Sequence, residues 1–282
     1  MSSTSSPDGS TTGSPDVVRS LTVGRRTLRV SVRPGRDEEL PPLLLMNGIG
    51  ASLEVLQPFV DAVDPRRTVI RFDVPGVGGS PRPVVPYVLS TLTPVVAGLL
   101  DRLGHPGEVD VLGLSWGGAL AQQFAVQHRR RCRRLVLAAT ATGTLMVPAR
   151  PEVLSRMLTP RRHRDPEYAR EIAGLIYGGT MRTEPERAAA ALHSHTRVGP
   201  RRGYYYQLAA STGWSSLPFL RLIRQPTLVV AGDDDPIIPM VNARVMARLI
   251  PRAQLHVYSG GHIALVTEAD QLAPVIDAFL DG

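Results

Sequence analysis

Short apolar runs of strand length recur along the chain, separated by longer segments in which apolar residues have helical spacing. The first two runs, residues 21–23 and 27–32, flank a glycine and a basic pair, so they predict an antiparallel hairpin. The later runs are apolar on both faces, which is typical of parallel strands in a sheet that helices cover on both sides. These later runs are residues 42–46, 68–72, 109–114, 135–140, 227–231 and 254–258.

Helix-length segments lie between these runs. Residues 90–103 are apolar on one side, residues 118–127 are rich in good helix formers, and residues 240–249 and 268–280 have helical spacing. The alternation of strands and helices predicts the α/β class, with a mostly parallel, doubly wound sheet.

The alternation breaks once, between residues 142 and 225. No comparable strand run occurs there, and residues 167–176 and 188–192 have helical patterns. Because ligands bind at the carboxyl edge of open α/β sheets, we interpret residues 142–225 as a helical cap, or lid, over that edge. The predicted core is then residues 17–141 and 226–282.

Composition narrows the class of protein. Apolar residues make up 43% and charged residues 20%, as in ordinary globular proteins, and no apolar run approaches the length of a membrane-spanning helix. Residues 1–16 are rich in Ser, Thr, Pro, Gly and Asp, lack the features of a secretory signal and are predicted to be a disordered tail. The single cysteine, Cys132, excludes an intramolecular disulfide, fits a reducing cytoplasm and is interpreted as structural.

The net charge is +7, and every one of the 32 basic residues is an arginine. Arginines cluster at residues 129–134 and at Arg161, Arg162 and Arg164, which we interpret as a solvated helix end and a solvated loop. No nucleic-acid-binding motif accompanies them and aromatic residues are not interleaved, so we predict no nucleic-acid partner.

A glycine-rich turn carries the first candidate catalytic residue. Ser115 stands in Gly-Leu-Ser-Trp-Gly-Gly, residues 113–118, between a predicted strand and a predicted helix. A nucleophilic serine on such a turn has a strained backbone, so the residues two positions away must be small, as Gly113 and Gly117 are. We therefore predict that Ser115 is a nucleophile, at a helix N-terminus that favours developing negative charge.

A serine hydroxyl needs a base to remove its proton, and His262 is the predicted base. It follows the last predicted strand and precedes the last helix, in a loop at the same sheet edge as Ser115. The other histidines are less suitable: His105 (a turn at the wrong edge), His128 and His163 (Arg-rich surface stretches), His193 and His195 (the cap) and His256 (inside a strand).

Three adjacent carboxylates, Asp233, Asp234 and Asp235, follow the predicted strand 227–231 at this same edge. Asp235 precedes Pro-Ile-Ile-Pro, as the orienting acid usually does in this type of fold, and is the predicted partner of His262. Asp234 is the alternative. Asp233 and Asp234 are expected to hydrogen bond within the turn.

Two backbone N–H groups are predicted to bind the oxyanion of an acyl-transfer intermediate. One belongs to Trp116, directly after the nucleophile, and the other to Ile49 in the loop Asn-Gly-Ile-Gly, with Gly48 as the alternative. The glycine-rich turn 73–80 has no phosphate-binding lysine and is interpreted as structural, shaping the rim of the pocket.

The chain order Ser, Asp, His is that of the α/β-hydrolases. Nearly the whole chain, residues 21–280, resembles one branch of that family, the intracellular depolymerases of medium-chain-length polyhydroxyalkanoates (PHA). The segments that carry the resemblance are residues 47–50, 73–80, 115–124, 135–140 and 224–236 in the core, and residues 175–179 and 203–208 in the cap.

The resemblance implies an α/β-hydrolase fold with a lid, and hydrolysis of 3-hydroxyacyl esters of a storage polyester through an acyl-enzyme on Ser115, without a metal or cofactor. It implies a cytoplasmic enzyme whose partner is a hydrophobic ester or polyester, with association to polyester granules as a further expectation. The oligomeric state stays open. Apolar cap side chains suit alkyl groups, although none is assigned a binding role: Met146, Met157, Met181, Tyr204, Tyr205, Tyr206 and Trp214.

Other functions remain open within the same fold. A small-molecule carboxylesterase, a lipase or a thioesterase would use the same triad. A proline iminopeptidase shares Ser-Trp-Gly and a helical cap, but it would need cap carboxylates for the substrate amine, and this cap is rich in arginine. A ligand-binding receptor without turnover is disfavoured by the complete triad, and dehalogenases and epoxide hydrolases need Asp in place of Ser115.

Overall fold

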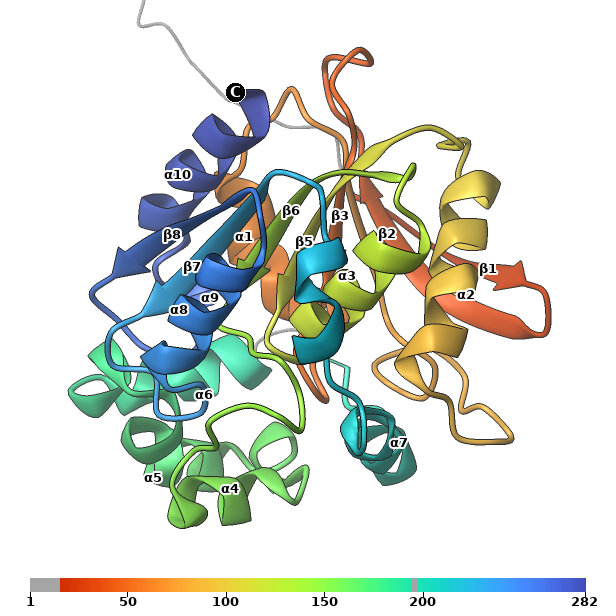
Figure 1. Ribbon diagram of the computed structural model, residues 1–282. Coiled ribbons are helices and arrows are strands. Elements are labelled where there is room, and N and C mark those ends of the chain that lie inside the picture. Colours follow the sequence, from red (N-terminus) through yellow and green to blue (C-terminus); the bar gives the residue numbers. More distant parts are fainter. Residues whose placement is uncertain (1–15, 194–196) are drawn as a thin grey trace, which may run out of the picture.

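Eight strands form one sheet in the computed structural model, which describes residues 16–193 and 197–282 (Figure 1). The strand order is β1-β2-β4-β3-β5-β6-β7-β8. β1 and β2 form the predicted hairpin, β2 also pairs antiparallel with β4, and the other pairings are parallel, so the predicted α/β class is confirmed. The strands are β1 Val17–Val23, β2 Arg26–Arg33, β3 Leu43–Met46, β4 Val69–Phe72, β5 Val109–Leu114, β6 Cys132–Ala138, β7 Thr227–Gly232 and β8 Ala253–Tyr258.

Helices cover both faces of the sheet and bury one apolar cluster on each side (Figure 1). Because both faces are covered, the central strands are apolar on both sides, as the sequence pattern indicates. The helices of the first face are α2 Leu89–Arg102, α3 Trp116–Gln127 and α8 Met240–Leu249. Those of the second face are η1 Leu53–Leu56, α1 Gln57–Ala62, α9 Ala264–Thr267 and α10 Ala269–Asp281.

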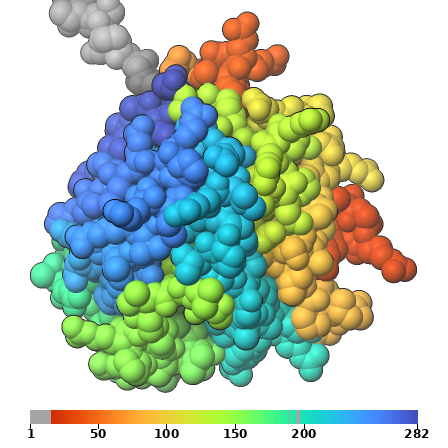
Figure 2. All heavy atoms as spheres, in the orientation of Figure 1, coloured from red at the N-terminus to blue at the C-terminus, as the bar shows by residue number. Residues whose placement is uncertain are grey.

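Residues 142–225, the predicted cap, are mostly helical, and their green and teal atoms cover the lower end of the molecule in Figure 2. α4, α5 and α6 lie together, with α7 to one side (Figure 1). The last part of the segment returns to the sheet, where Leu220 of η4 packs into the core cluster beside α3 and α8. The division into cap and core stays a prediction. The helices of this segment are α4 Pro151–Met157, η2 Arg161–His163, α5 Pro166–Tyr177, η3 Gly179–Arg182, α6 Pro185–His193, α7 Arg201–Ser211 and η4 Leu217–Leu222.

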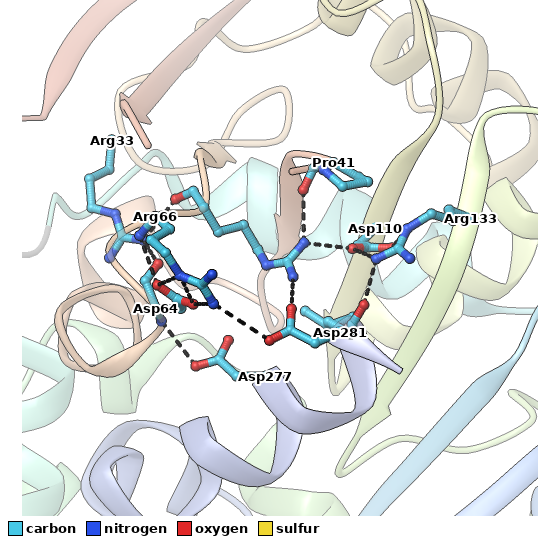
Figure 3. A network of polar contacts seen from close by, with 10 residues as sticks. Arg33, Pro41, Asp64, Arg66, Asp110, Arg133, Asp277 and Asp281 are labelled. Atoms are coloured by element: carbon cyan, nitrogen blue, oxygen red, sulfur yellow. Dashed lines mark hydrogen bonds and ion pairs between the residues drawn. The ribbon is translucent and has the colours of Figure 1, made fainter. Parts of the chain in front are cut away.

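A buried ion-pair network lies at the amino ends of the strands (Figure 3). Asp110, near the start of β5, accepts hydrogen bonds from Arg67 Nη1 (2.9 Å) and from Arg133 Nη2 (2.6 Å). Arg67 also donates to the Pro41 carbonyl and to the carboxylate of Asp281, near the end of the chain. The network therefore ties β5, β6 and α10 together at the edge opposite the candidate site.

Two smaller predictions concern the tail and the cysteine. Residues 1–15 lie outside the described residues, but the carboxylate of Asp16, the last residue of the predicted tail, pairs with the buried Arg71 of β4. Cys132 is buried at the start of β6 and has no disulfide partner. Burial raises the pKa of its thiol, which keeps the sulfur protonated and fits a structural role.

Candidate active site

Ser115 lies on the sharp turn between β5 and α3. Its backbone has φ 54° and ψ −116°, a left-handed conformation that is strained for any residue but glycine. A Cβ on Gly117 would lie 2.0 Å from the Met46 carbonyl oxygen, and a Cβ on Gly113 would lie 2.4 Å from the Gly117 carbonyl oxygen. Both positions therefore need glycine, for the reason that the sequence motif predicted.

His262 and Asp235 complete a hydrogen-bonded chain with this serine. His262 Nε2 lies 3.0 Å from Ser115 Oγ, and His262 Nδ1 lies 2.8 Å from Asp235 Oδ2. The imidazole is buried. The structure thus brings together the three residues that the sequence predicted as a triad, from the loops after β5, β7 and β8.

The sequence after Asp235 explains how this carboxylate is oriented. Its Oδ1 accepts hydrogen bonds from the backbone N–H groups of Ile237 and Ile238, each at 2.9 Å. The other oxygen is left for His262. The turn that follows the acid therefore holds one oxygen and aims the second at the imidazole.

The two neighbouring aspartates were expected to hydrogen bond within their own turn. In the described residues, the carboxylates of both instead bind partners outside it. Asp234 accepts two hydrogen bonds from the Arg182 guanidinium, both at 2.7 Å, and one from the backbone N–H of Gly179 in the cap. The hydrogen bond from Arg182 lowers the pKa of this carboxyl. Asp233 accepts from the N–H of Gly260. Asp234, the alternative acid, therefore binds the cap.

The predicted oxyanion donors lie around the serine. The loop Asn47–Gly50 passes close by, since a Cβ on Gly48 would lie 3.7 Å from Ser115 Cβ. The N–H of Gly48 is already bonded to Asn47 Oδ1 (2.8 Å). Within the described chain, the N–H groups of Ile49 and Trp116 donate to no other group. This geometry favours Ile49 over Gly48 and leaves the predicted pair of donors available.

Both cap segments that carry the family resemblance touch the core loops. The carbonyl of Tyr177 accepts a hydrogen bond from the backbone N–H of His262 (2.7 Å), and a Cβ on Gly178 would lie 1.9 Å from the Asp234 carbonyl oxygen. On α7, Gln207 binds both the N–H of Gly50, through Oε1, and Trp116 Nε1, through its backbone carbonyl. Cap and core are thus joined by hydrogen bonds and, at Gly178, by a backbone contact that leaves no room for a larger residue.

A small cavity of about 50 Å³ lies between Ser115 and the cap. Cap side chains form one wall of it: Met157, Arg162, His163, Tyr177 and Leu192. Of the apolar cap residues considered from sequence, Met157 alone lines this cavity in the described chain. The others lie elsewhere: Met146 and Tyr205 are partly or largely exposed, Met181 is in the cap interior, Tyr204 lines a neighbouring pocket, and Tyr206 and Trp214 pack on the core.

Two residues that sequence reasoning placed on the surface are buried at this cavity. Arg162 is 2% exposed and His163 is 8% exposed, so the interpretation of this stretch as a solvated loop is wrong for both. Arg161 and Arg164 on either side are exposed. Tyr204 of α7, far away in the sequence, accepts a hydrogen bond from Arg162 and helps to cover it. His195 lies outside the described residues.

The described residues contain no group of three or more His, Cys, Asp or Glu residues arranged to hold a metal ion. They also contain no helix that is both long and apolar enough to cross a membrane.

The chain matches the model of the alpha/beta hydrolase fold over residues 41–269 and therefore belongs to this family. It is 50% identical over 266 residues to the poly(3-hydroxyalkanoate) depolymerase of Ectopseudomonas oleovorans. The matched residues cover 94% of this chain and 93% of that protein. It is also 31% identical over 226 residues to the 2-hydroxymuconate semialdehyde hydrolase of Pseudomonas putida, covering 76% of this chain and 77% of that protein.

Among solved structures, the enol-lactonase from Burkholderia xenovorans LB400 has a TM-score of 0.78 and 26% identity, covering 94% of this chain and 100% of that one. These relatives are hydrolases. The predicted fold family, the predicted class of enzyme and the resemblance to PHA depolymerases are therefore confirmed.

Proposed function

We propose that this chain is a serine hydrolase that cleaves ester bonds of poly(3-hydroxyalkanoate), with Ser115, His262 and Asp235 as its catalytic triad. The observation that carries the proposal is the hydrogen-bonded chain from Ser115 Oγ through the imidazole to the Asp235 carboxylate, at 3.0 and 2.8 Å. The 50% identity to a poly(3-hydroxyalkanoate) depolymerase supports the class of substrate.

In the proposed mechanism, His262 takes the proton of Ser115 while Oγ attacks the ester carbonyl. The N–H groups of Trp116 and Ile49 stabilise the oxyanion, and the Asp235 carboxylate stabilises the imidazolium. The imidazolium then protonates the departing alcohol. A water molecule hydrolyses the acyl-enzyme by the same steps, so the reaction needs no metal or cofactor.

We also propose that residues 142–225 act as a lid over a core formed by residues 17–141 and 226–282. A cavity of about 50 Å³ holds only a few water molecules, so a polyester chain enters only when the lid or its side chains move. A cytoplasmic location at the surface of polyester granules belongs to the same proposal and follows from the substrate class.

The small cavity favours one other candidate, a carboxylesterase for small esters. The deciding assay measures 3-hydroxy acid release from a medium-chain polyester beside the hydrolysis of p-nitrophenyl esters of several chain lengths. We expect release of 3-hydroxy acids from the polyester, and its loss in Ser115→Ala. Activity on short esters alone would favour the second candidate.

A fluorophosphonate probe tests the nucleophile itself. The wild-type protein should be labelled covalently, and Ser115→Ala should not be. If the folded wild-type protein fails to react, the proposal of a serine hydrolase is wrong, whatever its substrate.

A further inference from the structure

One arginine of the cap is buried beside the proposed triad without an acidic partner. Arg162 in η2 lines the same cavity as Ser115 and His262. Its Nη1 donates to the Tyr204 hydroxyl (3.0 Å) and to the Thr159 carbonyl (3.4 Å), and the guanidinium lies 5.5 Å from the centre of the Tyr204 ring. These groups are hydrogen-bond partners, but none of them carries a negative charge.

The other two buried arginines of the described chain are balanced by acids. Arg67 pairs with Asp110 and Asp281, and Arg71 pairs with Asp16. Among the described residues, Arg162 has no carboxylate within ion-pair distance, and its nearest polar partners are tyrosine hydroxyls and the Thr159 carbonyl. Because an uncompensated buried charge is costly, a guanidinium on the wall of a cavity is well suited to an anionic ligand.

The groups around the guanidinium are neutral and leave hydrogen-bonding capacity unused. Burial, and then the charge of Arg162, hold the pKa of His163 well below its usual range, so this ring is neutral. The hydroxyl of Tyr177 lies near the guanidinium and, within the described residues, has no hydrogen bond of ordinary geometry. A guanidinium beside a hydroxyl that can donate is a set of donors that matches a carboxylate.

We propose that Arg162, assisted by the Tyr177 hydroxyl, binds the free carboxylate of the terminal 3-hydroxyalkanoate unit while Ser115 attacks the ester bond that holds this unit. The inference rests on the proposed ester hydrolysis. Four bonds separate the ester carbonyl carbon from the terminal carboxylate carbon, a span of about 5 Å when extended. The serine and the guanidinium line the same small cavity of about 50 Å³, so one short unit can contact both.

This assignment fixes the end from which the polyester is shortened. Ser115 Oγ bonds to the ester carbonyl, the bond from that carbonyl to the oxygen of the terminal unit breaks, and this oxygen takes from His262 the proton that Ser115 lost. Water then cleaves the acyl-enzyme, and its proton returns through His262 to Ser115. The enzyme thereby releases one 3-hydroxy acid per cycle and leaves a new carboxylate at the end of the chain.

The first test needs only the wild-type protein and two substrates. The dimer of 3-hydroxyoctanoic acid is compared as the free acid and as its methyl ester, in which a methyl group removes the charge of the terminal carboxyl group. We expect kcat/KM to be at least about tenfold higher for the free acid, as a charge-assisted hydrogen bond provides. Equal values for the two dimers would overturn the proposal.

The same assay separates failure of this inference from failure of the proposed function. Hydrolysis of both dimers at equal rates leaves ester hydrolysis intact and removes the role of Arg162. If p-nitrophenyl octanoate is cleaved while neither dimer nor polymer is, the proposed substrate class is wrong, and the inference falls with it.

A variant tests whether the preference for the free-acid dimer depends on Arg162. Arg162→Gln keeps a polar side chain but removes the charge, so we expect kcat/KM for the free-acid dimer to fall about 10- to 100-fold. The methyl ester and p-nitrophenyl octanoate should change by less than about threefold. Arg170→Gln removes an exposed cap arginine of α5 and is the matched control, expected to alter none of the three. A uniform loss on all three substrates in Arg162→Gln would mean a structural role and would overturn the proposal. If this variant does not fold, the wild-type comparison still decides.

Discussion

The amino and carboxyl edges of the sheet each hold an aspartate with a buried side chain, and the two aspartates differ in what balances their charge. Asp110 accepts hydrogen bonds from two guanidinium groups, which are permanent cations. Asp235 accepts from two backbone N–H groups and from His262, whose charge depends on a proton. A permanently paired carboxylate can only stabilise the fold, whereas one paired with an imidazole can stabilise a charge that appears during a reaction.

The buried arginines follow the same division. Arg67, at the amino edge, is paired with two carboxylates, whereas Arg162, at the cavity, is held by a hydroxyl and a carbonyl. We therefore expect substitutions at the amino edge to change stability and substitutions at the cavity to change catalysis.

Asp235→Asn should remove most of the activity and preserve the fold. The amide oxygen can still accept from the N–H groups of Ile237 and Ile238, but the amide nitrogen then donates to His262 Nδ1 and fixes the proton on Nε2. That tautomer cannot accept the proton of Ser115, so we expect kcat to fall about 10⁴-fold. Steady-state kinetics measures this loss, and thermal unfolding should give a melting temperature within about 3 °C of wild type.

The neighbouring Asp234 provides the control for that substitution. Asp234→Asn weakens a half-exposed ion pair with Arg182 and should cost less than about 1 kcal/mol of stability, with kcat unchanged. A larger loss of kcat in Asp234→Asn than in Asp235→Asn would reverse the assignment of the acid.

Asp110→Asn makes the same chemical change at the opposite edge and should have the opposite result. Arg67 and Arg133 would lose their shared counter-charge, so we expect the free energy of unfolding to fall by about 3–5 kcal/mol. Denaturant unfolding measures this, while kcat of the folded protein should stay at the wild-type value. Asp101→Asn, whose carboxylate is 54% exposed in its pair with Arg131, should cost less than about 1 kcal/mol. Similar losses of stability in Asp110→Asn and Asp101→Asn would contradict the expectation that burial makes an ion pair more important for stability.

The shifted pKa of His163 should make the free energy of unfolding depend on pH. Its native pKa lies well below the ordinary 6.5, mainly because of burial. As the pH falls, the unfolded chain therefore binds a proton on this imidazole before the native protein does. Below about pH 6.5 the unfolded state then binds more protons, and stability falls as the pH drops, by up to about 1.4 kcal/mol per pH unit. His163→Gln should remove this part of the slope between about pH 6.5 and 5.5 and leave the slope above about pH 7.5 unchanged.

Urea unfolding at each pH measures the slopes. A wild-type slope in His163→Gln would show that the native ring is protonated, contrary to its environment beside Arg162.

Arg162→Met should have only a small effect on stability. The change removes an uncompensated buried charge and replaces it with an apolar side chain, so we expect the free energy of unfolding to change by less than about 1 kcal/mol. Arg67→Met, which leaves Asp110 and Asp281 without this partner, should cost about 3 kcal/mol or more. Equal losses of stability in the two variants would contradict the difference in charge balance between the two arginines.

The sheet and the three site loops could be predicted because each depends on short local patterns. The glycines around Ser115 are one example, since the strained turn at the serine requires small residues at positions 113 and 117. Likewise, the N–H groups that orient Asp235 come from the two residues after Pro236. Local sequence was therefore sufficient for these positions.

The partners that come from distant segments could not be predicted. Arg162 and His163 stand among exposed arginines, and their burial depends on packing against α7, including Tyr204 from about forty residues later. The partner of Asp234 was not predicted either, because Arg182 stands 52 residues earlier in the sequence, in the cap. The choice of Ile49 over Gly48 likewise depends on where the Asn47 side chain points.

The glycine pair Gly178 and Gly179 constrains how such enzymes can be recombined. A Cβ on Gly178 would meet the Asp234 carbonyl oxygen at 1.9 Å, and one on Gly179 would meet the Gly261 nitrogen at 2.4 Å. A chimaera that received its cap from another hydrolase without this pair would push apart the loops that carry Asp235 and His262. New substrate ranges should therefore be engineered by exchanging single side chains that face the cavity, with the cap backbone retained.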